Sequence, residues 1–200
     1  MERLDDAEDK RLMAALAGGE DLALNRLIER WQGPVRQFVF RSTQHETDTE
    51  DLVQETFVRV YRHRQRYAPK GRFSTWLFTI AANLCRNHAE KKSRRLTVSL
   101  DAPLEDATGD PSGRGALPQH AAPDADPAVA VVTNERLAAV RAAIGELPPD
   151  LREAVLLFEY QQLSHAEIAQ VAGATPKAIE TRLYRARALL RERLARYLRS

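Results

Sequence analysis

Two clusters of basic side chains could bind nucleic acid. Residues 59–95 contain 11 basic side chains and one acidic one, and residues 176–200 contain eight and two, yet the 200-residue chain has a formal net charge of only +2. A surface built only for solubility usually mixes both signs. The segregation therefore favours two separate surfaces that contact anionic partners, with solvated helix faces as the alternative.

The C-terminal cluster falls on a helix-turn-helix pattern. A short helix over 165–172, a turn at 173–175 and a helix from Pro176 have the spacing of that motif. Early residues of the second helix reach base edges in the major groove, and later arginines lie nearer phosphates. DNA binding is favoured over a structural helical hairpin. The residues expected to face outward are Lys177, Glu180, Thr181, Arg182, Tyr184, Arg185 and Arg187.

The first basic cluster combines charge with aromatic and amide side chains. The stretch from Tyr67 to Arg95 contains Asn83 and Asn87 one helical turn apart, so both can face one groove. Such a composition suits single-stranded, unstacked bases. Trp76 lies on an apolar helix face, which favours a core position. The helix before this stretch is acidic over residues 48–55 and runs into arginines at 59–66. This pattern predicts one end that faces a protein and one end that faces DNA. The acidic residues alone are also explained by their favourable position at a helix N-terminus.

Catalysis is not indicated. The sequence lacks HExxH, GxSxG, P-loop and GxGxxG spacings. Its five histidines are expected to be exposed, and no metal site or cofactor is predicted. The single cysteine, Cys85, excludes an internal disulfide and is expected to be a buried structural thiol. With no signal peptide and no membrane span, the expected compartment is the cytoplasm.

The apolar spacing predicts an all-α chain of two small helical domains. Residues 101–127 contain five prolines and three glycines and no aromatic residue, which predicts a flexible linker that lets the domains lie far apart on a shared partner. The domains are therefore 1–100 and 128–200. Helices are predicted over 5–17, from 21, after a capping box of Thr47 and Glu50, over about 74–93, from Asn134 to Gly145, from Pro148, over 165–172 and from 176 to about 198.

Two sets of motifs resemble a known family. Residues 49–61 (TEDLVQETFVRVY) and 73–83 (FSTWLFTIAAN) look like region 2 of bacterial sigma factors of the extracytoplasmic function (ECF) group, within the sigma-70 family. Residues 147–155 (LPPDLREAV), 163–173 and 181–187 look like region 4 of the same group. The resemblance implies a region 2 bundle, a region 4 helix-turn-helix and a promoter-specificity subunit of RNA polymerase.

The resemblance also implies roles for individual residues. Docking on the polymerase clamp is expected from Asp51, Leu52, Gln54, Glu55 and Phe57. Contact with the −10 element is expected from Arg59, Arg62, Arg66, Tyr67, Arg72, Phe73, Asn83, Arg86 and Asn87, with loop 66–73 capturing an extruded base. The resemblance assigns the outward residues of the last helix to the surface that reads the −35 element. Glu180 stands where a basic residue is common, which changes the expected −35 sequence.

The partners implied are core RNA polymerase through its clamp and flap, promoter DNA and an anti-sigma factor. The competing hypothesis is a polymerase-independent helix-turn-helix regulator, which explains residues 147–198 but assigns no task to 48–95. The sigma hypothesis predicts that the free chain binds promoters weakly, because its two DNA surfaces are not held in register until polymerase fixes them.

Overall fold

All regular elements are helices in residues 5–68, 71–99 and 127–198, which the computed structural model describes. The all-α prediction is confirmed. Residues 101–126 of the predicted linker lie outside the described residues, and Pro127 already belongs to a helix. The first domain comprises α1 (Asp6–Ala17), α2 (Leu22–Thr43), α3 (Glu46–Arg62), the 3₁₀ turn η1 (Arg64–Arg66) and α4 (Phe73–Ser99). The second comprises α5 (Pro127–Gly145), α6 (Pro149–Val155), the π-helical η2 (Leu156–Tyr160), α7 (His165–Ala172), α8 (Pro176–Arg193) and α9 (Ala195–Leu198).

The core of the first domain is built around packed aromatic rings. Trp31 of α2 contacts Phe73 of α4 edge-on at 5.7 Å between ring centroids, and Phe38 contacts Phe78 at 5.4 Å. Edge-to-face packing of this kind adds stability beyond the buried area alone. The pair Asp9–Arg30, at 2.8 Å with Asp9 fully buried, joins α1 to α2.

Phe38→Ala is expected to lower the free energy of unfolding by about 3–5 kcal/mol, because it removes a buried ring and leaves a cavity between α2 and α4. Urea denaturation followed by circular dichroism measures the loss. Leu22→Ala is the matched control, because Leu22 is exposed, and it should stay within about 0.5 kcal/mol of the parent chain. Equal stability of Phe38→Ala and the parent would contradict this packing.

The helix boundaries of the second domain follow its local sequence signals. Ser164 and Glu167 form a capping box at α7, Gly173 ends that helix in the left-handed region at φ 61°, and Thr175 caps α8 ahead of Pro176. These predictions are confirmed. Two others are wrong: α5 starts at Pro127 rather than after Asn134, and the last helix breaks at Leu194.

The Thr47–Glu50 capping box is also wrong. Helix α3 starts at Glu46 with His45 as its N-cap, so Thr47 already lies inside the helix. An ion pair from Arg36 of α2 to Glu46 holds the start of α3, and Glu46 and Asp48 supply negative charge at this helix N-terminus.

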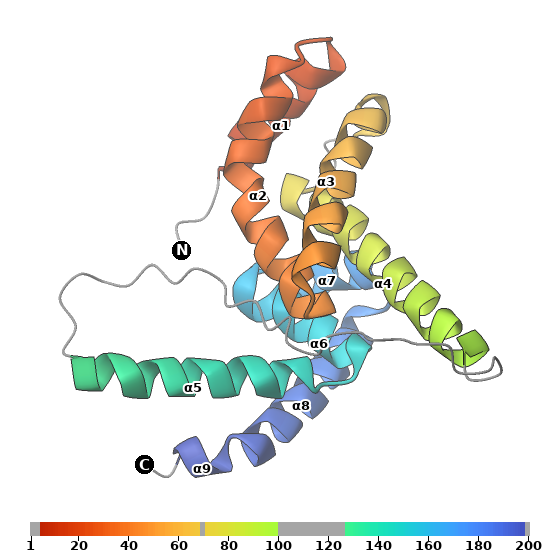
Figure 1. Cartoon of the computed structure of the whole chain (residues 1–200). Helices are drawn as coiled ribbons and strands as arrows, with labels where there is room; N and C mark the ends of the chain where they lie inside the picture. The colour runs from red at the N-terminus through yellow and green to blue at the C-terminus, as the bar shows by residue number, and fades with distance from the viewer. Residues whose placement is uncertain (1–4, 69–70, 100–126, 199–200) are drawn as a thin grey trace.

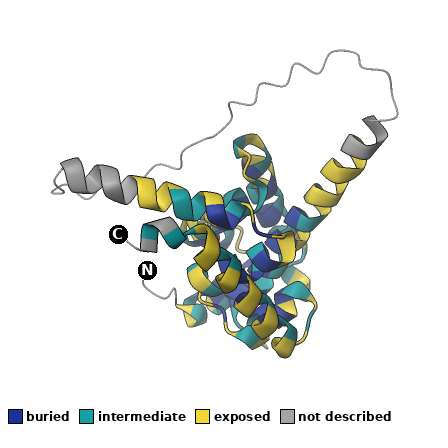
Figure 2. Ribbon diagram, turned by 90° about the horizontal axis from the view of Figure 1, so that it is seen from below, coloured by how far each residue is buried: buried dark blue, intermediate teal, exposed yellow. Residues whose placement is uncertain are grey.

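The two domains pack against each other in this structure. Helix α7 lies along α4, and α6 and η2 contact α2 (Figure 1). Figure 2 shows the buried residues gathered where the helices cross, while residues 89–95 of α4 and 135–138 of α5 are exposed. The buried residues of α4, which include Thr75, Ala82 and Cys85, spread beyond one stripe because the helix is covered from two sides. Within the described residues no helix is long and apolar enough to cross a membrane.

Candidate functional site

An apolar groove of about 870 Å³ runs between α2 and α3. Leu22, Leu24 and Ile28 line it from α2, and Val53 and Phe57 line it from α3. Leu22 is 78 % exposed, which is unusual for a leucine of this size. A contiguous apolar surface on a polar-rimmed helix pair is typical of a protein-binding site.

The predicted polymerase residues divide between two faces of α3. Gln54 and Phe57 lie in the groove. Asp51, Leu52 and Glu55 line a second depression, of about 420 Å³, between α3 and α4. Leu52 and Phe57 are also largely buried, so both contribute to the core.

The outward face of α8 presents an aromatic ring and cations. Tyr184 is 77 % exposed and Arg185 is exposed beside it. Lys177 and Glu180 form an exposed ion pair at 2.8 Å, and the hydrogen bond and charge of Lys177 lower the pKa of Glu180. The Thr181 hydroxyl donates to the backbone oxygen of Lys177 at 3.0 Å.

Two other predicted members of this surface brace α8 against its own domain. Arg182 lies 3.5 Å from Asp150 of α6, and Arg187 lies 3.1 Å from Glu159 and over the ring of Phe158. The surface free for a ligand is therefore centred on Tyr184 and Arg185.

A capping box fixes the start of α7, the first helix of the helix-turn-helix. The Ser164 hydroxyl accepts from the backbone N–H of Glu167 at 3.3 Å, and the Glu167 carboxylate accepts from the Ser164 N–H at 2.8 Å. Burial acts to raise the pKa of Glu167, but the Ser164 hydrogen bonds and the charge of Arg72 outweigh it, so the pKa lies below its usual range.

Ser164→Ala is expected to cost about 1 kcal/mol of stability, because the first turn of α7 loses its side-chain acceptor. Thermal unfolding followed by circular dichroism measures it. Gln170→Ala, at an exposed position of the same helix, is the comparison and should have a smaller effect. An unchanged melting temperature for Ser164→Ala would contradict the role of the capping box.

The start of α4, which carries the predicted −10 residues Arg72 and Phe73, is fixed by contacts with α1. Asp6 accepts from the backbone N–H of Phe73 at 2.7 Å, and the Gln65 amide donates to the backbone oxygen of Ala17 at 2.7 Å. Burial acts to raise the pKa of Asp6, but hydrogen bonds from Lys10 and Phe73 outweigh it and lower the pKa.

The nine predicted −10 residues differ in accessibility. Arg62, Arg66, Asn83 and Asn87 are exposed. Arg59 pairs with Glu55 at 2.8 Å, and Tyr67 is half-buried against Trp76, where burial raises the pKa of its hydroxyl to about 12. Phe73 is fully buried, so this structure presents none of its ring to a base.

The second domain covers the remaining two. Arg72 lies 3.6 Å from Glu167, and Arg86 lies 2.7 Å from both carboxylate oxygens of Glu153. Burial raises the pKa of Glu153 even though Arg86 opposes that shift. Cys85, next to Arg86, is buried as predicted, and burial raises the pKa of its thiol to about 12.

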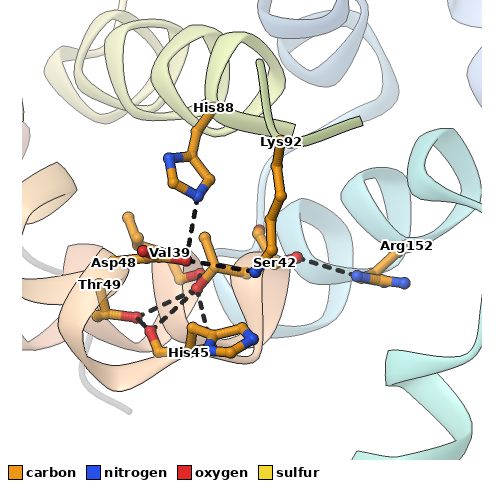
Figure 3. Close-up of polar contacts among 9 residues, drawn as sticks. Val39, Ser42, His45, Asp48, Thr49, His88, Lys92 and Arg152 are labelled. Atoms are coloured by element: carbon orange, nitrogen blue, oxygen red, sulfur yellow. Dashed lines mark hydrogen bonds and ion pairs between the residues drawn. The ribbon is translucent and has the colours of Figure 1, made fainter. Parts of the chain in front are cut away.

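A polar cluster joins α2, α3 and α4 (Figure 3). Asp48 accepts from His88 at 3.0 Å and lies 3.7 Å from Lys92. In the same view Arg152 of α6 donates to the backbone oxygen of Ser42 at 2.9 Å. His88 is therefore a partner of a carboxylate rather than a freely exposed side chain.

Comparisons with known proteins agree on one family. Residues 27–95 match the family model of sigma-70 region 2, and residues 137–190 match that of sigma-70 region 4. The RNA polymerase sigma-H factor of Pseudomonas aeruginosa is 30 % identical over 200 residues, which cover 98 % of each chain. The chain belongs to the sigma-70 family of RNA polymerase sigma factors. The ECF RNA polymerase sigma-E factor of Escherichia coli strain K12, 32 % identical over 90 % of each chain, places it in the ECF group.

Solved structures show the same fold for this ECF sigma factor. CnrH, in complex with the cytosolic domain of CnrY, superposes with a TM-score of 0.65 at 27 % identity, covering 94 % of this chain and 97 % of that one. The sigma factor RpoE of Bartonella quintana, in complex with the anti-sigma factor NepR, superposes with a TM-score of 0.64 at 23 % identity, covering 86 % and 96 %. The first domain is region 2 and the second is region 4.

Several residues that shape these surfaces were not predicted from the sequence. Leu22, Leu24 and Ile28 fit an ordinary core stripe, and only the structure shows that they line a groove. Glu153 and Glu167 carry no sign in the sequence that they contact region 2. Their spacing fits any amphipathic helix, so no local signal could have found them.

Proposed function

We propose that this sigma factor binds core RNA polymerase through the α2–α3 groove, the −10 element through region 2 and the −35 element through α8. As an ECF sigma factor the chain directs core polymerase to specific promoters and assists strand opening. The exposed apolar groove is the observation that carries the proposal. A polymerase-independent repressor has no use for such a surface, whereas a sigma factor needs one for the enzyme.

The groove fits a helix of the polymerase. Its floor is apolar, and its rim carries Asp21, Gln32, Glu50 and Gln54, which can hydrogen-bond to a partner. Helix-in-groove recognition uses apolar anchors within a polar rim. The acids Asp51 and Glu55 face the other depression, which Arg59 and Lys91 also line, so that depression suits a second, polar contact on the same clamp.

The DNA surfaces suit different states of the promoter. Region 2 offers hydrogen-bond donors and positive charge to a separated strand through Asn87, Arg62 and Arg66. Opening the duplex costs a few kcal/mol for each base that is flipped out. Tyr184 and Arg185, on a rigid helix, suit duplex DNA through base edges and phosphates. The polymerase, and not this chain, forms the RNA bonds. We expect the complex to act in the cytoplasm. We also propose that an anti-sigma factor regulates this chain.

DNA selection with and without polymerase tests the proposal. The immobilised chain is incubated with a pool of genomic fragments, alone or with core RNA polymerase of the same bacterium, and the retained DNA is sequenced. We expect promoter fragments with two common motifs only when polymerase is present. Retention of one short motif regardless of polymerase would instead support a stand-alone regulator.

A further inference from the structure

Glu180 places a carboxylate on the outward side of α8, close to the start of the helix. It is the fifth residue of the helix and the one acid among residues 176–186. Its side chain is 55 % exposed, and that of Lys177, one turn earlier, is 80 % exposed. Ile179 and Leu183 are buried on the side of α8 that packs into the domain core. Glu180 is therefore presented to whatever α8 binds.

The stability of α8 does not explain this carboxylate. A negative charge stabilises a helix N-terminus within the first turn, and Glu180 lies beyond it. Its partner is Lys177 of the same helix, at 2.8 Å, and an exposed pair of this kind adds little to stability. Arg182 and Arg187 differ, because acids of α6 and η2 hold them against their own domain. Glu180 is therefore available for binding.

The charge of Glu180 restricts the bases that it can read. The hydrogen bond and charge of Lys177 lower the pKa of Glu180, so the side chain is ionised at neutral pH and only accepts hydrogen bonds. In the major groove guanine presents two acceptors and thymine one, and these repel a carboxylate. Adenine places an acceptor beside its amine, whereas cytosine presents the N4 amine as its polar group. Cytosine is therefore the base that fits an acceptor at this position.

Lys177 allows the carboxylate to approach DNA. Phosphates flank the groove and repel an isolated acid, and the ammonium 2.8 Å from Glu180 offsets that repulsion. An ammonium has three donors, of which one is used on Glu180. The others can reach guanine O6 or N7. In a C·G pair the cytosine amine lies beside those guanine acceptors, so the Lys177–Glu180 pair matches both bases.

We propose that Glu180 selects a cytosine in the −35 element by accepting a hydrogen bond from its N4 amine, with Lys177 beside it on the paired guanine. The inference rests on the proposed binding of the −35 element by α8, and it names the base that this part of the surface prefers. A bidentate contact discriminates between bases by about 5-fold to 150-fold. The contact of one exposed carboxylate should lie toward the lower end of that range, at about tenfold.

Selection of promoter fragments with a randomised −35 element tests this on the holoenzyme formed with core RNA polymerase of the same bacterium. The parent chain should enrich cytosine at one position about tenfold over the other bases. E180A should lose the preference at that position alone, while the loss of repulsion from phosphates strengthens binding to all sequences uniformly. E192A removes an exposed acid near the end of the same helix, and this control should keep the preference for cytosine. An unchanged base preference in E180A, or the same change in E192A, would overturn the proposal.

Removing the amine from the DNA provides a second readout. In the selected site the cytosine is replaced by 2-pyrimidinone, which keeps the ring and lacks the N4 amine. The parent holoenzyme should lose about tenfold in affinity, and E180A should lose less than about twofold. Equal losses in both would overturn the proposal.

The same selection separates this inference from the proposed function. If Arg185→Ala changed the −35 preference and E180A did not, α8 would still be the reading helix and only the cytosine contact would be wrong. A parent holoenzyme with no −35 preference would contradict the proposed role of α8 together with the contact that rests on it.

Discussion

Leu22→Asp is expected to weaken binding of core RNA polymerase about 30-fold or more, from a loss on the order of 2 kcal/mol. The substitution places a charge in the α2–α3 groove, where an apolar helix of the polymerase would bury it unpaired. Because Leu22 is already exposed in the free chain, the fold should not change. Titration of labelled sigma factor with core enzyme, followed by fluorescence anisotropy, measures the effect.

Leu137→Asp is the matched control. Leu137 is an exposed leucine of α5, 44 % accessible and outside the groove. The affinity of the Leu137→Asp variant for polymerase should lie within about twofold of that of the parent chain. Equal affinities for Leu22→Asp and the parent would rule out the groove as the polymerase site, provided that both variants show the parent's thermal unfolding.

Arg185→Ala is expected to cost about 1–3 kcal/mol of promoter binding by the holoenzyme, which is a loss of between about 5-fold and 150-fold in affinity. Arg185 is exposed on α8 beside Tyr184, where neither side chain braces the helix against its own domain. Loss of a base contact should also relax the preference at one position of the −35 element, whereas loss of a phosphate contact should weaken all sequences uniformly. Binding of the holoenzyme to promoter fragments with a randomised −35 element measures both.

Arg26→Ala is the control for charge, because Arg26 is an exposed arginine of α2 and lies outside the α8 surface. Its promoter affinity should match that of the parent chain. If Arg185→Ala retained full affinity and the same −35 preference, α8 would not be the reading helix in the way proposed.

The helix-turn-helix was predictable because its signals are local. A serine three residues before a glutamate, a glycine after the short helix and a threonine–proline pair at the next start each determine backbone geometry within one turn. All three are found as predicted around Ser164, Gly173 and Thr175. The break at Leu194 was not predictable in this way, since no proline or glycine lies near the end of α8. The α5 start does coincide with a proline, Pro127, but the prediction assigned that proline to the linker.

Tertiary contacts limited the prediction of the site. The spacing of Leu22 and Ile28 fits a core stripe, and only the position of α3 leaves part of that stripe uncovered. The sequence suggested domains that can separate. The contact between Glu153 and Arg86 joins residues that are 67 positions apart in the chain, so no local pattern predicts it. Phe73 was expected at the −10 element and is part of the core, because Trp31 and Tyr67 pack on its ring.

Run-off transcription tests the central claim most directly, by asking whether this chain confers promoter-specific initiation on core polymerase. Core enzyme of the same bacterium, freed of other sigma factors, is supplied with a pool of genomic fragments and nucleotides, and the transcripts are sequenced. With the parent chain we expect discrete start sites that share two upstream motifs, and with Leu22→Asp at the same concentration we expect far fewer transcripts from those sites. Transcription that is identical with and without the chain would contradict the account.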